Sequence, residues 1–114
     1  MPYLRIQTNV EPAPAARKDL LASASAKVAA ALGKPERYVM VAFEGGVPMA
    51  FAASDAPLAY LELKSIGLPG ESTAELSRTL CELVASALGI PGERIYIEFT
   101  DAPRHLWGWN GGTF

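Results

Sequence analysis

Cysteine and histidine are nearly absent from this chain of 114 residues, which contains one of each, Cys81 and His105. A single cysteine excludes an internal disulfide bond and a Cys-x-x-Cys motif. Zinc sites need several such ligands together, so we expect no metal site. No phosphate-binding loop occurs either, and we expect no cofactor. The low cysteine content is typical of a reducing compartment, which favours a cytoplasmic protein.

Long apolar runs and basic clusters are also missing. No apolar stretch reaches 18 residues, and the N-terminus lacks a charged region followed by an apolar one, so we expect neither a membrane helix nor a signal peptide. The ten basic residues are scattered and the net charge is −2, which argues against nucleic acid as a partner. Half of the residues are apolar and 19% are charged, which predicts one folded domain over residues 1–114.

A repeat organises the chain. Residues 31–43 resemble residues 87–99, and each copy begins Ala-Leu-Gly, at Gly33 and Gly89, with a proline two positions later. Apolar residues recur at three- and four-residue spacing before each glycine, which predicts two helices that end there. Ser72 and Glu75 have the spacing of a capping box at the start of the second helix. A β-rich segment follows each glycine.

A strand-like segment precedes each helix, at residues 3–8 and 59–65. We therefore predict two β-α-β units, each with parallel strands and a right-handed crossover. Side by side they form an α+β fold, a four-stranded sheet with both helices on one face. The uncovered face predicts an oligomer. Residues 45–51 suggest a turn and a short extra strand, and the tail 106–114 suggests another edge strand.

Pro2 is a candidate catalytic base, because proline follows the initiator methionine directly. Cells usually remove a methionine that precedes a small residue, and the proline nitrogen then becomes a basic secondary amine. Burial or a nearby cation lowers the pKa of such an amine toward neutrality, where a general base works best. With Met1 attached, that nitrogen is an amide and not a base. The alternative is an ordinary proline at the start of a strand.

Other candidates are weaker when taken singly. Lys34, in the loop before the second strand, could bind a substrate carboxylate or could be a solvated lysine at a helix C-terminus. Tyr96 and Glu98 project from one face of a strand. Tyr38, Trp107, Trp109 and Phe114 provide aromatic surface, which more often serves packing than a pocket.

Together these features resemble the macrophage migration inhibitory factor family of the tautomerase superfamily. The resemblance covers nearly the whole chain and rests on five motifs in order. They are Met1-Pro2 with Thr8-Asn9-Val10, Gly33-Lys34-Pro35, Ser65-Ile66-Gly67, Arg94-Ile95-Tyr96-Ile97, and Gly108-Trp109-Asn110 with Thr113-Phe114. The run 64–67 and the ending 106–111 are most similar to bacterial, especially cyanobacterial, members.

The resemblance implies a homotrimer with active sites between subunits, in which Pro2 catalyses keto–enol tautomerisation. It implies that Lys34 and the backbone N–H of Ile66, beside Ser65, hold a substrate carboxylate. It further implies that Tyr96 comes from an adjacent subunit, and that Tyr38, Trp109 and Phe114 form a wall for a phenyl ring. An aryl α-keto acid such as phenylpyruvate is the expected small-molecule partner.

Three positions depart from mammalian members. Glu98 replaces an asparagine, which puts substrate preference in question, because a carboxylate accepts a phenolic hydrogen bond but repels an anion. Lys64 stands where histidine is common, and its charge favours an anion. Pro57-Leu58-Ala59-Tyr60 replaces a Cys-x-x-Cys linked to a proposed redox activity, which we expect to be absent here.

Two other functions stay open at this point. One is a cytokine-like, receptor-binding trimer with a vestigial pocket, since mammalian relatives leave cells without a secretion signal. The other is a related reaction such as decarboxylation or hydrolytic dehalogenation of a small unsaturated acid. Relatives with those reactions use added arginines or acids around the proline, and the sequence offers no convincing set.

Overall fold

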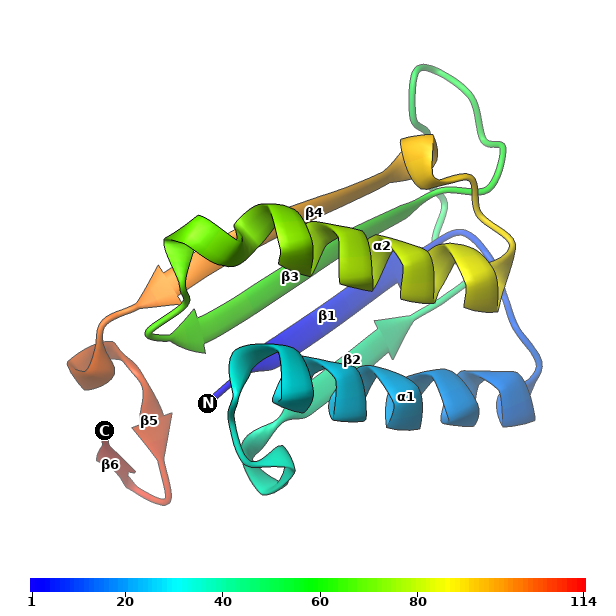
Figure 1. Ribbon diagram of the computed structural model, residues 1–114. Helices are drawn as coiled ribbons and strands as arrows, with labels where there is room; N and C mark the ends of the chain where they lie inside the picture. Colours follow the sequence, from blue (N-terminus) through cyan, green and yellow to red (C-terminus); the bar gives the residue numbers. More distant parts are fainter.

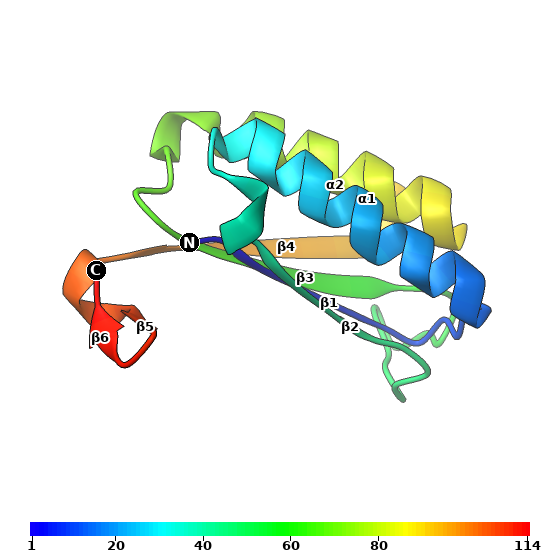
Figure 2. The ribbon, with the colours of Figure 1, turned by 90° about the horizontal axis from the view of Figure 1, so that it is seen from below.

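Two long helices lie side by side on one face of a four-stranded sheet in the computed structural model, which describes residues 1–114 (Figures 1 and 2). The strands of the sheet are β1 (Tyr3–Thr8), β2 (Met40–Glu44), β3 (Ala59–Ile66) and β4 (Ile95–Ala102), and the helices are α1 (Pro14–Leu32) and α2 (Thr73–Leu88). Four short 3-10 helices lie between these elements. They are η1 (Glu36–Tyr38) before β2, η2 (Gly70–Ser72) before α2, η3 (Gly92–Arg94) before β4, and η4 (Arg104–Leu106) after β4.

The sheet has the strand order β2-β1-β3-β4. β1 pairs with β2 in parallel and β3 pairs with β4 in parallel, so both predicted β-α-β units are confirmed. The two units join through β1 and β3, which are antiparallel. This arrangement places Tyr3 opposite both Met40 and Lys64. The N-terminus of the chain therefore lies where β2 begins and β3 ends.

Both predicted helix ends are confirmed. Gly33 and Gly89 adopt the left-handed conformation, with φ of 62° and 68°, and the backbone N–H of Gly89 donates to the carbonyl of Ala85 at 2.9 Å. Glycine takes this conformation without the steric cost that a Cβ brings. The predicted capping box is wrong, because Ser72 makes no side-chain hydrogen bond at the start of α2. Ser72 belongs instead to η2, whose first carbonyl, at Gly70, accepts a hydrogen bond from the Thr73 hydroxyl at 3.2 Å.

The hydrophobic core lies between the helices and the sheet. Alternate residues of β1 and β3 face the helices, and Leu4, Ile6, Leu61 and Leu63 are completely buried. The helices contribute a stripe each, including Leu20, Ala24 and Val28 from α1 and Leu76, Leu80 and Val84 from α2. Burial of this apolar surface drives the packing of the helices on one face.

The opposite face of the sheet is covered by no helix in the single chain (Figure 2). Charged side chains lie on this face. Arg5 contacts Glu44 at 2.8 Å and Glu62 at 3.9 Å, and Lys64 lies 3.6 Å from Glu62. Arg5 thus links β1 to β2 and to β3, and the Lys64–Glu62 pair lies within β3. The expectation that this face requires a second chain stays a prediction.

The predicted extra strand within residues 45–51 is wrong. That segment forms no strand, and Phe51 makes only an isolated bridge with Ser54. The carbonyls of Phe51 and Ser54 accept hydrogen bonds from Arg94 at 3.2 and 3.0 Å, so the chain leaves the sheet here. The tail does contain strands, a two-stranded hairpin of β5 (Gly108–Trp109) and β6 (Gly112–Thr113) near the N-terminus (Figure 1).

Candidate functional site

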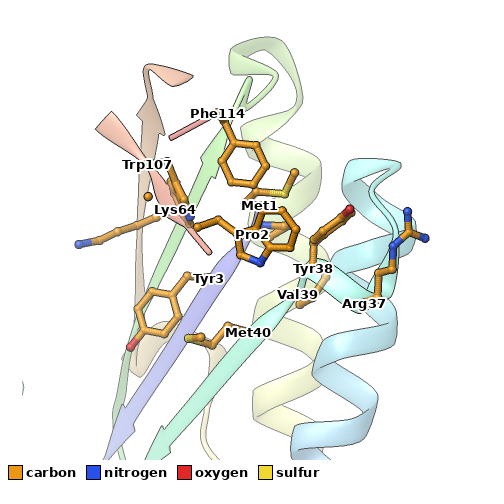
Figure 3. Close-up of a pocket in the computed structure, with 12 residues that line it drawn as sticks. Met1, Pro2, Tyr3, Arg37, Tyr38, Val39, Met40, Lys64, Trp107 and Phe114 are labelled. Carbon is orange, nitrogen blue, oxygen red and sulfur yellow. The ribbon is translucent and has the colours of Figure 1, made fainter. Parts of the chain in front are cut away.

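A cavity of about 580 Å³ opens at the edge where the N-terminus, η1, the end of β3 and the C-terminal hairpin meet (Figure 3). Its position follows from the sheet topology, because β1 starts beside the start of β2 and the end of β3. The residues that line it come from four separate parts of the sequence: Met1, Pro2, Tyr3, Arg37, Tyr38, Val39, Met40, Lys64, Trp107, Gly108, Trp109 and Phe114.

Pro2 lies within this cavity, and its side chain is almost completely buried. The Met40 backbone N–H donates to the Pro2 carbonyl at 3.0 Å, which fixes the residue at the start of β1. Burial, and to a lesser extent the positive charge of Lys34, lowers the pKa of the α-amino group of Met1 below its ordinary value of 8.0. The N-terminal amine therefore lies in surroundings that disfavour its protonated form.

Three aromatic side chains form one wall of the cavity. The Tyr38 and Trp109 ring centroids are 5.9 Å apart with the rings nearly perpendicular, and Trp109 stacks on Phe114 at 5.9 Å. These are the edge-to-face and stacked geometries that aromatic rings prefer. Figure 3 shows Met1 between Pro2 and Phe114. The sequence prediction had grouped Tyr38, Trp109 and Phe114, and the structure brings them together.

Lys34 lies beside the cavity and not on its lining. Its ammonium group donates to the carbonyl of Ile66 at 3.1 Å, and the hydroxyl of buried Ser65 donates to the same carbonyl at 3.3 Å. The loop after α1 thus meets the end of β3 next to the N-terminus. The structure brings Lys34, Ser65 and Ile66 together at one point.

Tyr96 and Glu98 lie elsewhere in the same chain. Tyr96 is opposite Tyr60 in the sheet, whereas Tyr3, the residue after Pro2, is opposite Lys64 near the end of β3. Four residues of extended chain separate these two levels, about 13 Å along the strand. Tyr96 packs on Phe51, with ring centroids 4.7 Å apart, and lines a second, apolar hollow of about 380 Å³. Neither residue joins the Pro2 cavity within one chain.

Glu98 has a partner of its own, the hydroxyl of Tyr60, which donates to its carboxylate at 2.9 Å. This hydrogen bond, then burial and the charge of Glu62, raises the pKa of Tyr60 to about 12. Glu98, which stands where mammalian members have asparagine, therefore accepts a hydrogen bond from Tyr60 of the same chain. Ionisation of the phenol would place a second negative charge beside the carboxylate.

We expect Glu98→Gln to lower the pKa of Tyr60 from about 12 toward the ordinary 10.0, because a neutral amide removes the charged acceptor. Titration of phenolate absorbance in the folded protein measures this change, and Tyr60→Phe identifies which of the four tyrosines moves. Glu62→Gln is the matched control and should shift the curve less. A titration curve identical for wild type and Glu98→Gln would contradict the assignment.

Sequence reasoning missed several cavity residues, of which Arg37 is the most important chemically. Tyr3, Val39 and Met40 were missed as well, whereas Trp107, which also lines the cavity, was among the predicted aromatic residues. The sequence held part of the information needed to find them. Residues 3–8 were predicted to pair in parallel with the strand after Gly33, and this pairing places the residues just before that strand beside the N-terminus. The exact side chains that close the cavity depend on the turn of η1 and on the position of the tail.

Two β-α-β units with a buried proline at the start of β1 have the architecture of the tautomerase superfamily, and comparison with known proteins supports this class. The family model described as macrophage migration inhibitory factor (MIF) matches residues 1–114. The chain is 41% identical to the macrophage migration inhibitory factor homolog of Trichuris trichiura over the full length of both, and 43% identical to that of Brugia malayi, over all of this chain and 99% of the relative. The chain belongs to the macrophage migration inhibitory factor family.

Solved structures agree with this assignment. The chain is similar to the macrophage migration inhibitory factor homologue from Prochlorococcus marinus, with a TM-score of 0.93 and 48% identity over 98% of each chain. It is also similar to macrophage migration inhibitory factor from Trichinella spiralis, with a TM-score of 0.92 and 34% identity over 98% of this chain and 99% of that one. The family membership supports a tautomerase-like or cytokine-like function. No helix of this fold is both long and apolar enough to cross a membrane.

Proposed function

We propose that this protein is a keto–enol tautomerase of aryl α-keto acids such as phenylpyruvate, with Pro2 as the general base after removal of Met1. The observation that supports this most directly is the position of Pro2, which is buried and still lines a cavity with an aromatic wall. A base in a partly dry cavity next to a flat apolar surface suits proton abstraction from a carbon beside a ring-bearing ketone.

The expected strength of the base follows from its surroundings. The same burial and the same Lys34 charge that lower the pKa of the Met1 amine would act on the Pro2 nitrogen once it becomes the N-terminus. Pro2 is more deeply buried than Met1, so desolvation should act at least as strongly there. An amine with a pKa below its ordinary value is partly unprotonated near neutral pH and can accept a proton.

Substrate binding would use the groups that surround Pro2. Lys34 would exchange its contact with the Ile66 carbonyl for the substrate carboxylate, which the Ile66 N–H and the adjacent Ser65 help to position. The phenyl ring would lie against Tyr38, Trp109 and Phe114. A carboxylate held at one end and a ring at the other would place the intervening methylene at Pro2.

The proposed reaction is an isomerisation, in which one proton moves from carbon to oxygen and no group is gained or lost. The Pro2 nitrogen takes a proton from the carbon next to the ketone, and the electrons of that C–H bond form the enolate. The protonated proline then returns the proton to the enolate oxygen to give the enol, or to carbon in the reverse direction. Lys34 would stabilise the negative charge on the substrate throughout.

A homotrimer would complete the site, since Tyr96 and Glu98 do not reach the cavity of their own chain. Tyr96 is 64% exposed, which leaves its hydroxyl free for a neighbouring subunit. In this arrangement the uncovered face of each sheet would turn toward the other subunits. Glu98 would then border the neighbour's cavity with its carboxylate bonded to Tyr60.

The proposal is tested by measuring the intact mass and the phenylpyruvate tautomerase rate on one purified sample. We expect the mass to lack Met1, and the rate to exceed that of buffer and to rise with pH as the proline amine loses its proton. A processed protein that does not exceed the buffer rate at any pH would overturn the proposal. A sample that retains Met1 should be inactive and should gain activity on treatment with methionine aminopeptidase.

A further inference from the structure

Basic side chains line the Pro2 cavity, and no acidic side chain does. They belong to Arg37 and Lys64. Lys34 adds a third cation close by. A substrate such as phenylpyruvate carries one carboxylate, and on the function proposed above Lys34 takes it. The cavity therefore has basic side chains beyond the one that this carboxylate would use.

Arg37 forms no salt bridge in the chain, unlike Lys64 on the same cavity lining. The salt bridges of this protein involve Arg5, Arg17 and Lys64, and none includes Arg37. Lys64 is already 3.6 Å from Glu62, and in Figure 3 its ammonium group points away from Pro2. Lys64 is thus paired with an acid and directed outward. Arg37 is unpaired and lies beyond Tyr38 from Pro2 in Figure 3, which leaves Arg37 as the better ligand for an anion at the outer, aromatic end.

Tyr38 holds Arg37 at the aromatic end of the cavity. The guanidinium carbon lies 4.8 Å from the centre of the Tyr38 ring, a cation–π distance. Tyr38 in turn packs against Trp109, so the guanidinium borders the wall on which an aryl ring would lie. Figure 3 shows Arg37 and Lys64 on opposite sides of the cavity. An anionic group on the far end of a bound ring would come near Arg37.

We propose that the substrate class of this site is an aryl α-keto acid with a second anionic group on its ring, and that Arg37 binds this group and determines specificity. This inference rests on the proposed function and names its substrate more closely. The planar guanidinium can donate two parallel hydrogen bonds to a carboxylate, which a lysine at the same place could not match.

The test compares two substrates that differ by one carboxylate, phenylpyruvate and phenylpyruvate with a para-carboxylate on the ring. For wild type we expect a kcat/KM about tenfold higher for the dianion, a preference that falls as salt screens the exposed guanidinium. Arg37→Gln should remove most of this preference and leave phenylpyruvate turnover within about twofold. Arg37→Lys should restore part of it.

Arg78→Gln is the matched control, because Arg78 is an exposed arginine on α2 that lies outside the cavity. The same loss of charge there should change neither rate. Equal turnover of both substrates by wild type, or equal losses for both in Arg37→Gln, would overturn the inference and leave the proposed function intact. Failure of processed wild type to turn over either substrate would overturn the proposed function and the inference with it.

Discussion

Replacement of Pro2 by glycine should lower kcat/KM for phenylpyruvate by about 10²–10⁴-fold, the usual contribution of a positioned general base. Glycine leaves a free amine after removal of Met1 but loses the secondary amine and the rigid ring that fix the nitrogen in the cavity. Pro2 is almost completely buried, so a displaced amine would also be re-solvated and its pKa would return toward the ordinary value. Steady-state kinetics on mass-verified protein measure the loss.

An alanine inserted between Met1 and Pro2 is the complementary variant. It retains the proline ring and converts its nitrogen to an amide, whereas Pro2→Gly retains a free amine and removes the ring. Both variants should be nearly inactive, with the oligomeric state of the wild type. Full activity in both would remove Pro2 from the mechanism. An inactive wild type together with tight binding of the Pro2→Gly variant to a host receptor would favour the cytokine-like alternative.

Replacement of Arg94 by alanine should cost about 1.5–3 kcal/mol of the free energy of unfolding, the range for hydrogen bonds to charged groups. The guanidinium donates to four backbone carbonyls of one loop, those of Phe51, Ser54, Ala56 and Pro57, at 3.0–3.2 Å. It also lies 5.4 Å from the centre of the Phe51 ring. Urea unfolding at fixed protein concentration measures the change, since subunit association would add to apparent stability.

The loop needs this support because its turn is strained. Ala52 and Ala53 have φ of 52° and 61°, a left-handed conformation that alanine rarely adopts. Arg78→Ala is the control, an exposed arginine without such contacts, and Arg94→Lys should recover part of the loss because one ammonium cannot reach four carbonyls in a planar fork. Equal urea midpoints for Arg94→Ala and Arg78→Ala would show that the loop does not depend on Arg94.

The repeat made the fold predictable. The two Ala-Leu-Gly copies marked both helix ends, since left-handed glycine followed by proline is a local signal that needs no tertiary contact. Parallel pairing within each unit followed from the handedness of the crossover. The predicted strand within residues 45–51 was wrong because the structure there depends on a distant contact. The segment leads into a two-residue turn that uses Ala52 and Ala53 in place of the usual asparagine and glycine. The arginine that holds this turn, Arg94, lies about 40 residues away in the chain.

The sequence predicted several residues of the candidate site but not how they pack together. Pro2 and Lys34 could be paired because parallel strands begin at the same end of a sheet, and the structure places the Lys34 charge close enough to affect the N-terminal amine. Tyr38, Trp109 and Phe114 could be named as aromatic surface. Their packing on one another, and the entry of Arg37 beside them, depend on where the C-terminal hairpin folds back.

By itself, the sequence determined the two β-α-β units, the helix ends and the position of a proline directly after the first residue. Those features depend on local backbone preferences and on hydrophobic periodicity, which act between near neighbours. Only the tertiary structure decided which side chains share the cavity and which lie about 7–13 Å away along the same sheet. The antiparallel join of β1 to β3 sets that arrangement, because it brings the N-terminus to the end of β3. Tyr96 and Glu98 stay opposite Tyr60 and Glu62, four and two residues before Lys64.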